Sequence, residues 1–152
     1  MNYFVTVEEL HENGYKDIPT MGGVYIVKAP ENFSVEITNN TTAIKNHEGK
    51  NLLYNKEFLE EKYSKVVDKS ILYYGKATNL RNRISALVKY GYNECNNHRG
   101  SKALWQLKNS SKFIIEYYIC DDSRNPREEE KRLIQEYKNK NNNNRPFANF
   151  QD

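Results

Sequence analysis

Residues 71–88, ILYYGKATNLRNRISALV, contain a change of hydrophobic period that constrains the whole fold. The run Ile71-Leu72-Tyr73-Tyr74 has the apolar, aromatic composition of a β-strand. Gly75 ends this run, and from Asn79 onward the apolar residues fall on one face of a helix. Those residues are Leu80, Ile84, Leu87 and Val88. The sequence therefore predicts a strand that turns at a glycine into a helix, whose first N–H groups lack partners and favour an anion.

Several segments of the chain, in this order, resemble the signature of the GIY-YIG nucleases. Gly23-Val24-Tyr25 is similar to the first half of that signature, and YYGKATNLRNR, which begins at Tyr73, is similar to the second half. The family's remaining marks follow in order as His98, Glu130 and Asn149. The resemblance implies a metal-dependent nuclease domain.

The predicted fold is a small α+β domain with a three-stranded antiparallel sheet, at about 23–28, 71–75 and 113–120, flanked by helices. Thr6 with Glu9 forms a capping box, which predicts a helix over 7–13. Asn125-Pro126 fits the start of a last helix that runs to about Tyr137. After it, Phe147 and Phe150 are expected to pack back on the domain.

A segment of about 31–70 separates the two tyrosine strands, where the family usually has a short hairpin. We expect one domain over 1–152 with this segment as an insertion. Within it the sequence predicts a strand at 33–38, a polar loop at 39–51 and a helix at 55–67.

Charge is uneven along the 152 residues. The net charge of +3 is too small to indicate nucleic acid by itself. Between Lys76 and Lys112, however, eight Lys or Arg accompany a single acid, Glu94. This segment is either a solvated basic face or a phosphate-binding surface, and the signature favours the second.

The two cysteines, Cys95 and Cys120, form no C-x-x-C pair and accompany no His cluster, so we expect neither a zinc site nor a disulfide framework. No apolar run reaches the ~18 residues of a transmembrane helix, and the start lacks a signal-peptide profile. We expect a cytoplasmic protein without a membrane partner.

Glu130 is the most informative single residue. It precedes Leu133, Ile134 and Tyr137 by three, four and seven positions, which places a carboxylate at the edge of the apolar face. The neighbouring Glu128 and Glu129 are expected to point more nearly to solvent. An acid of the first helical turn is also explained by the helix dipole alone. Carboxylate oxygen is a suitable ligand for Mg²⁺ or Mn²⁺, and the resemblance makes Glu130 the sole protein ligand of one such ion.

Tyr25 and Tyr73 have two interpretations. In a chain with twelve tyrosines, two on strands are often core residues. The resemblance instead places both hydroxyls in the active site. A phenol titrates near ~10 and is a poor base unless cations favour its phenolate. We expect Tyr25 to deprotonate the attacking water and Tyr73 to orient it.

The remaining candidates are cations and hydrogen-bonding residues. Arg83 borders the apolar stripe, so its guanidinium can reach back to the turn and clamp a phosphate, and Lys76 follows the turn itself. Arg81 is either a backbone-phosphate contact or solvated. His98 is either an incidental loop residue or a proton relay. The resemblance assigns Asn149 to bracing the site, and we group it with Lys76 and Arg81 as substrate-binding.

The predicted function is an endonuclease that hydrolyses phosphodiester bonds in DNA, with RNA left open as a substrate. Its catalytic residues would be Tyr25, Tyr73, Arg83, His98 and Glu130, with Mg²⁺ or Mn²⁺ as the cofactor. Two alternatives are a catalytically inactive nucleic-acid-binding module of the same fold and a domain with a purely structural or protein-binding role.

Overall fold

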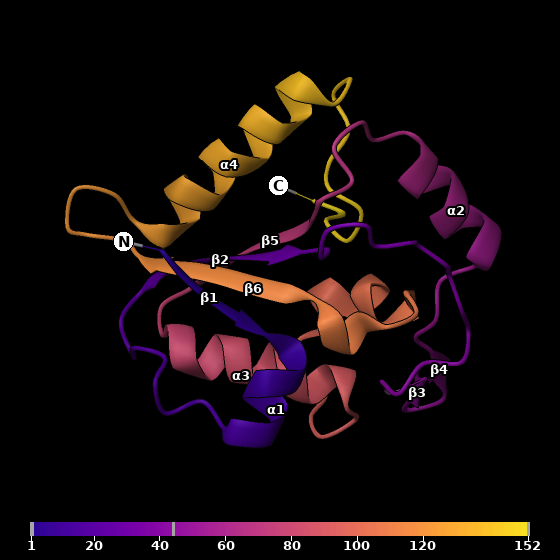
Figure 1. The fold of residues 1–152 in the computed structure, drawn as a ribbon, viewed down its shortest axis with the longest axis horizontal. Coiled ribbons are helices and arrows are strands. Elements are labelled where there is room, and N and C mark those ends of the chain that lie inside the picture. Colours follow the sequence, from indigo (N-terminus) through magenta and orange to yellow (C-terminus); the bar gives the residue numbers. More distant parts are fainter. Residues whose placement is uncertain (1, 44, 152) are drawn as a thin grey trace.

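The computed structural model describes residues 2–43 and 45–151 and places one antiparallel sheet between two layers of helices (Figure 1). The sheet order is β1-β6-β2-β5. Its strands are β1 (Tyr3–Thr6), β2 (Gly23–Lys28), β5 (Ile71–Ala77) and β6 (Ile114–Ile119). The three predicted strands are confirmed, but the sheet has a fourth. β1 was missed because it is a four-residue edge strand that pairs only with β6.

The helices cover the two faces unequally. Below the sheet in Figure 1 lie α1 (Val7–Asn13) and α3 (Leu80–Gly91), and above it lies α4 (Pro126–Lys140). Two 3₁₀ helices, η1 (Arg99–Gln106) and η2 (Ser110–Lys112), complete the lower layer. The larger core cluster fills that layer, while a smaller one, with Ile26, Tyr74, Ile134 and Tyr137, lies under α4.

Local capping explains why these helices begin where the sequence predicted. The Glu9 N–H donates to Thr6 Oγ1 at 3.1 Å and the Thr6 N–H donates to Glu9 Oε1 at 3.0 Å, so the capping box at α1 is confirmed. The side chains of Asn79 and Asn125 cap α3 and α4 by accepting from the N–H three residues on. The expectation that the first N–H groups of α3 lack partners is wrong, because those of Leu80 and Arg81 donate to carbonyls of the loop before β2. The last helix starts at Pro126 as predicted and ends at Lys140, beyond the expected Tyr137.

The segment between β2 and β5 differs from its prediction in two places. Residues 33–38 form no strand and make only an isolated bridge, Ile37 to Leu107. The expected loop at 39–51, of which Ile44 lies outside the described residues, contains a short hairpin. Its strands are β3 (Asn46–His47) and β4 (Lys50–Asn51). The predicted helix is present as α2 (Lys56–Ser64), shorter than 55–67.

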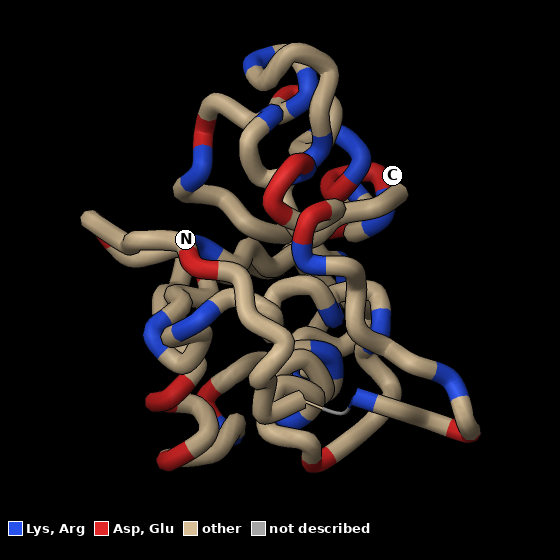
Figure 2. The backbone as a smooth tube through the Cα atoms, turned by 90° about the vertical axis from the view of Figure 1, so that its right-hand side faces the viewer, with Lys and Arg blue, Asp and Glu red and all other residues tan. Residues whose placement is uncertain are grey.

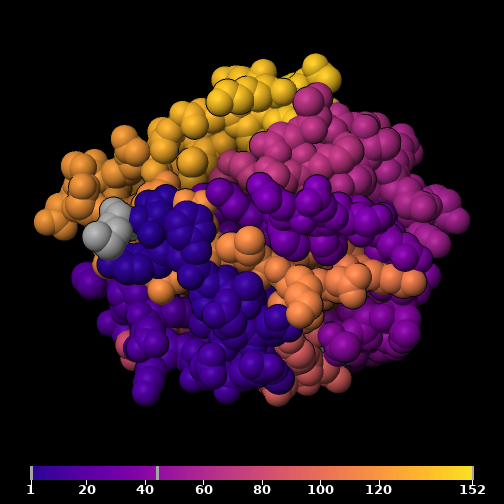
Figure 3. All heavy atoms as spheres, in the orientation of Figure 1, coloured from indigo at the N-terminus to yellow at the C-terminus, as the bar shows by residue number. Residues whose placement is uncertain are grey.

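The C-terminal tail runs between α4 and α2 (Figure 1) and is held by one lysine. Lys62 Nζ on α2 donates to the carbonyls of Pro146, Phe147 and Asn149 at 2.8, 2.7 and 2.9 Å. Phe147 is buried and Phe150 stacks on Tyr54, as the sequence predicted for these phenylalanines. In the space-filling view, α2 and the C-terminal part of the chain pack together on the upper right (Figure 3). The insertion and the tail thus form one surface.

Replacing this lysine is expected to destabilise the protein. Lys62→Met leaves three carbonyls without their charged donor, which should lower the free energy of unfolding by about 2 kcal/mol. Lys65→Met on the same helix removes only an exposed pair with Glu61 and should change stability by less than about 0.5 kcal/mol. Urea unfolding measures both, and equal midpoints would contradict the anchoring role.

No helix in the described ranges is long and apolar enough to cross a bilayer.

Candidate active site

The two signature tyrosines lie on the same face of the sheet. Tyr25 on β2 is directly opposite Gly75 on β5, and a Cβ atom at Gly75 would overlap the Tyr25 ring. The absence of a side chain there lets the ring lie across the neighbouring strand. Tyr73, two residues before Gly75, points to the same face, and the ring centroids of Tyr25 and Tyr73 are 6.2 Å apart. The two phenols therefore lie together, as the resemblance implies. The prediction that Gly75 ends the strand is wrong, because β5 continues to Ala77 and Gly75 pairs with Tyr25 inside it.

His98 reaches the Tyr25 hydroxyl, with Nε2 2.6 Å from the phenolic oxygen. Its other nitrogen, Nδ1, lies 2.8 Å from Ser101 Oγ, and the Ser101 hydroxyl donates to the His98 carbonyl at 3.1 Å. Because that hydroxyl proton is committed to the carbonyl, we assign the ring proton to Nδ1, which donates to Ser101. Nε2 is then the acceptor of the Tyr25 O–H. Sequence reasoning missed Ser101, since a serine one turn along a loop helix gives no signal until the helix is folded.

The environment keeps these three side chains uncharged. Burial, with a smaller contribution from the Arg83 charge, lowers the pKa of His98 to about 3. Burial raises the pKa of Tyr25 well above 10, and burial together with the Glu130 charge raises the pKa of Tyr73 to about 12. The Arg83 charge opposes both rises, and a side-chain hydrogen bond between Tyr73 and Tyr25 also opposes the rise in the pKa of Tyr73. At neutral pH the group is therefore a chain of neutral hydrogen-bonding residues.

Arg83 reaches back from α3 toward the phenols, as predicted from its place on the helix. Its Nη1 donates to the Asn97 carbonyl at 2.8 Å, which fixes the guanidinium beside the His98 loop. Its positive charge lowers the pKa of Tyr25, Tyr73 and His98 alike. Arg83 is thus the cation common to the whole cluster.

Glu130 meets this cluster at the edge of the sheet. It projects from α4, on the face opposite the two phenols, but β5 is an edge strand. Side chains from both of its faces therefore line one pocket of ≈ 380 Å³, among them Tyr73, Lys76 and Glu130. Lys76 Nζ lies 3.4 Å from Glu130 Oε1. Burial raises the pKa of Glu130 and the Lys76 charge opposes that rise.

The donor set suits a single hard cation held mainly by water and substrate. The described residues contain no group of three or more His, Cys, Asp or Glu placed to hold a metal. Mg²⁺ commonly binds through one or two carboxylates together with waters and substrate phosphates. The Glu130 carboxylate in an open polar pocket fits that pattern, and no second protein ligand is needed.

Two of the predicted substrate-binding residues have structural partners. Arg81 donates from Nε to the Ile18 carbonyl and from Nη2 to the Lys16 carbonyl, both at 2.8 Å. It therefore braces the loop before β2. Asn149 accepts from the Tyr74 N–H at 2.9 Å and donates to the Tyr74 carbonyl at 3.0 Å, so it completes the free edge of β5. The hydrogen bonds of both side chains are therefore made to the protein backbone. Asn149 also lines the pocket of Glu130, but its amide bonds β5.

The prediction that Glu129 points to solvent is wrong. Its side chain is 4% exposed and bonds Arg124, Arg132 and the Tyr118 hydroxyl. These contacts, that with Arg132 first, lower the pKa of Glu129 to about 2. Two of these partners lie outside the helix, Arg124 in the turn before α4 and Tyr118 on β6. The position of Glu129 on the helix therefore could not predict its burial. Glu128 is exposed, as predicted.

The basic segment 76–112 divides between the site and the scaffold. Its members that line the pockets around the site are Lys76, Arg83, Arg99 and Lys102. The other four have partners in the scaffold. Arg81 bonds two backbone carbonyls, Lys89 lies over the Tyr15 ring, Lys108 pairs with Glu36 and Lys112 with Glu8. On the side of the molecule that bears α2, basic and acidic positions are interspersed (Figure 2). Half of the basic residues of this segment therefore line the two pockets, and the side of the molecule shown in Figure 2 carries both signs of charge.

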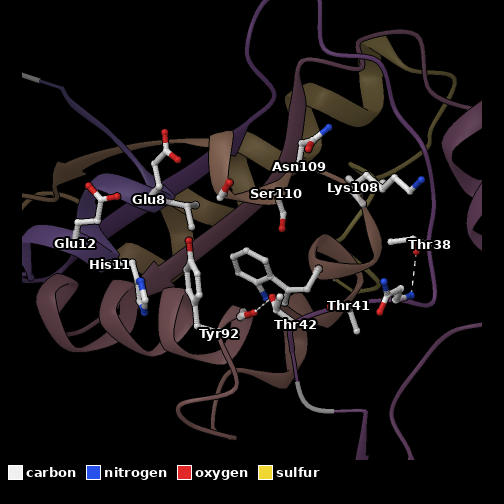
Figure 4. Close-up of a pocket in the computed structure, with 16 residues that line it drawn as sticks. Glu8, His11, Glu12, Thr38, Thr41, Thr42, Tyr92, Lys108, Asn109 and Ser110 are labelled. Carbon is white, nitrogen blue, oxygen red and sulfur yellow. Dashed lines mark hydrogen bonds between the residues drawn. The ribbon is translucent and has the colours of Figure 1, made fainter.

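A further pocket, of ≈ 580 Å³, lies beside α1 and η2 (Figure 4). His11 and Tyr92 stack there with ring centroids 3.6 Å apart, near Glu8 and Glu12. None of the predicted site residues lines it. It is separate from the tyrosine cluster.

Comparison with known families agrees with this geometry. The model of the GIY-YIG catalytic domain matches residues 44–144, which is 101 of the 152 residues. No curated protein and no solved structure matches the chain. The matched region begins after Tyr25, so the place of the first tyrosine rests on its pairing with Gly75 in the folded sheet. On the extent of this match, the chain belongs to the GIY-YIG catalytic domain family.

Proposed function

We propose that this protein is a metal-dependent DNA endonuclease that hydrolyses phosphodiester bonds. The observation that supports it best is the meeting of Tyr73, Lys76 and Glu130 in one pocket, with Tyr25 and His98 directly behind. Membership of the family makes nuclease chemistry the expected use of such a site.

Arg83 and Lys76 would hold the scissile phosphate. Both line a second pocket of ≈ 620 Å³ that lies beside the starts of α3 and α4, and Lys76 also lines the pocket of Glu130. A strand bound across Lys76 would therefore pass from one pocket to the other. Arg83 would place its donors on the phosphate oxygens, where negative charge grows in the transition state. Glu130 would hold Mg²⁺ or Mn²⁺, which supplies Lewis-acid stabilisation of the leaving 3′ oxygen.

The hydrogen-bonded chain suggests a path for the proton of the attacking water. Tyr73 lines the pocket, whereas Tyr25 is 1% exposed and lies behind it. We therefore exchange the roles expected from sequence. The water proton passes to the Tyr73 oxygen as the Tyr73 proton moves to Tyr25 and the Tyr25 proton moves to His98 Nε2. The water oxygen then bonds to phosphorus, the bond to the 3′ oxygen breaks, and that oxygen takes a proton from solvent. The proton on His98, which its low pKa makes acidic, returns through Tyr25 and Tyr73 to solvent and restores the neutral chain. The products carry 5′-phosphate and 3′-hydroxyl ends.

This relay needs no preformed phenolate, which the raised pKa values of Tyr25 and Tyr73 disfavour. Ser101 holds the His98 ring with Nε2 toward Tyr25. Tyr73 can therefore pass its own proton to Tyr25 as it accepts the proton of the attacking water.

The direct test is the nicking of supercoiled plasmid by the purified protein. Cleavage is expected with Mg²⁺ or Mn²⁺ and should stop when EDTA removes the metal. End-labelling should find 5′-phosphate on the products. Salt-sensitive binding of DNA without cleavage in either metal would overturn the proposal and favour the inactive binding module.

The dependence of cleavage on pH should have one acidic limb, set by Glu130. Metal binding needs the ionised carboxylate, so activity rises with pH as Glu130 loses its proton, at a pH above the ordinary carboxyl range because its pKa is raised. His98 is neutral on both sides of this limb because its pKa is about 3. A profile of kcat/KM at a fixed, subsaturating Mg²⁺ concentration measures this, and an inflection near ~6.5 that disappears in His98→Gln would contradict the neutral histidine.

A further inference from the structure

Three aromatic rings from the insertion and the tail form a continuous stack beside the site. Tyr54 and Phe150 are nearly parallel, with centroids 4.7 Å apart and planes at 10°. Phe58 lies 6.0 Å from Tyr54 and 6.1 Å from Phe150, with interplanar angles of 29° and 20°, so the three rings form a cluster in which each contacts the other two. Phe58 remains 48% exposed. We refer to Tyr54, Phe58 and Phe150 as the aromatic wall.

The aromatic wall borders the pocket in which Glu130 lies. Tyr54 and Phe150 line it together with Tyr73, Lys76 and Glu130. One side of this ≈ 380 Å³ pocket therefore carries the residues proposed for the chemistry, and another side carries flat apolar surface. A group bound at Glu130 would have an aromatic ring as its near neighbour.

Cations accompany the aromatic wall within the same pocket. Arg99 and Lys102 line it, and Lys102 Nζ lies 4.9 Å from the centroid of the Tyr54 ring. Glu130 is the only acid among the described residues that line the pocket. Surfaces that bind single-stranded nucleic acid combine aromatic rings with cations. The bases stack on the rings, and the phosphates contact the cations.

The aromatic wall is held in place by hydrogen bonds from the scaffold. The Tyr54 N–H donates to Gln106 Oε1 at 2.8 Å, and Gln106 Nε2 donates back to the Tyr54 carbonyl at 3.0 Å. Lys62 fixes the tail that carries Phe150 through the three carbonyls described above. The rings are therefore ordered before any ligand arrives, which reduces the entropic cost of binding.

We propose that the aromatic wall stacks an unpaired nucleobase next to the scissile phosphate, with Arg99 and Lys102 on the adjoining phosphates. Lys102, which lies over the Tyr54 ring in the free protein, moves to a phosphate as the base takes its place. Bases inside a duplex have both faces covered by their neighbours, so only an unpaired base can present a face to Tyr54. The preferred substrate is then a single strand, an overhang or a flap. Blunt linear duplex is a poor substrate, whereas supercoiled plasmid, in which negative supercoiling favours local unwinding, is still nicked. This inference rests on the proposed nuclease function and specifies its substrate class.

Binding in EDTA separates this inference from catalysis. The probes are a fluorescein-labelled deoxyoligonucleotide of about twelve nucleotides and its blunt duplex. Wild type should bind the single strand more tightly. Tyr54→Leu should weaken single-strand binding by about tenfold and leave duplex binding unchanged, whereas Tyr54→Phe should retain the wild-type affinity.

Two exposed phenylalanines provide a matched pair of variants. Phe58→Ala removes a ring of the aromatic wall and should weaken single-strand binding, while Phe4→Ala removes the 62%-exposed ring of β1 and should not. Lys102→Ala should reduce the salt dependence of binding by about one counterion. Thermal unfolding of each variant shows whether a lost affinity reflects lost structure.

The outcomes distinguish the two proposals. If the protein nicks plasmid but Tyr54→Leu binds single strand and duplex with wild-type affinities, the aromatic wall has no role and the inference fails alone. If no nucleic acid is cleaved in Mg²⁺ or Mn²⁺, the nuclease function itself fails. A ribo-oligonucleotide that binds more tightly than the deoxy probe, with the same loss in Tyr54→Leu, supports stacking and identifies RNA as the strand.

Discussion

Glu130→Gln is expected to lower metal-dependent cleavage by at least about a hundredfold while leaving the protein as stable as wild type or more so. The amide keeps the shape of the side chain but removes the charge that a divalent cation needs. The carboxylate is 10% exposed, and burial raises its pKa, so the folded protein holds this charge at a cost. Removing it relieves that cost. Plasmid nicking and urea unfolding measure the two effects.

Glu129→Gln is the matched control. It removes the adjacent buried carboxylate, whose pKa is lowered where that of Glu130 is raised, so it should lower stability and leave cleavage intact. Arg132, Tyr118 and Arg124 lower the pKa of Glu129 to about 2, so its charge stabilises the fold above pH ~4.5. That contribution is lost as the pH falls toward 2. At pH 7 the variant should lose about 1–3 kcal/mol of stability, a range discounted because both arginines are about half-exposed. It should still nick plasmid.

The pair gives an unambiguous result. Loss of cleavage in Glu129→Gln with retention in Glu130→Gln would remove Glu130 from the site. Equal effects of the two changes on both measurements would mean that the loss of cleavage reflects unfolding and not metal binding.

Local rules recovered the parts of the fold that local interactions determine. Composition located β2, β5 and β6, the change of period located α3, and side-chain caps located the starts of α1 and α4, because each signal lies within a few residues of its effect. Within the site, the helical place of Arg83 is of the same kind. The place of Gly75 is not, since its pairing with Tyr25 depends on another strand.

The features that sequence missed depend on partners distant along the chain. β1 exists because β6, more than a hundred residues away, supplies its hydrogen bonds. Arg81 turned out to brace residues 16–18, and Ser101 to orient His98, through contacts that form only after folding. The aromatic wall combines Tyr54 and Phe150 in the same way. The hydrophobic period of a single segment cannot predict contacts with a distant segment.

Tyr25→Phe is expected to reduce cleavage by about 10²–10⁴-fold, because the Tyr25 hydroxyl connects the pocket to His98 Nε2 behind it. Its oxygen lies 2.6 Å from His98 Nε2, and a hydrogen bond links it to Tyr73. The phenylalanine ring still fills the space over Gly75, so the packing of β2 on β5 is kept. Tyr74, which follows Tyr73 on β5, provides the control. Its side chain points to the opposite face of the sheet, into the cluster under α4, so Tyr74→Phe should leave cleavage unchanged.

The relay also predicts that the effects of removing the two hydroxyls on the cleavage rate are not additive. If the proton passes through Tyr73 and Tyr25 in series, either phenylalanine breaks the path, and the double variant should be no slower than the slower single one. If the hydroxyls act independently, one on the water and one on the phosphate, their losses multiply. Single-turnover cleavage rates of the two single variants and the double variant decide between these cases, with His98→Gln expected to join the non-additive set. Additive losses would rule out the path and leave Tyr73, the phenol at the pocket, as the group that meets the water alone.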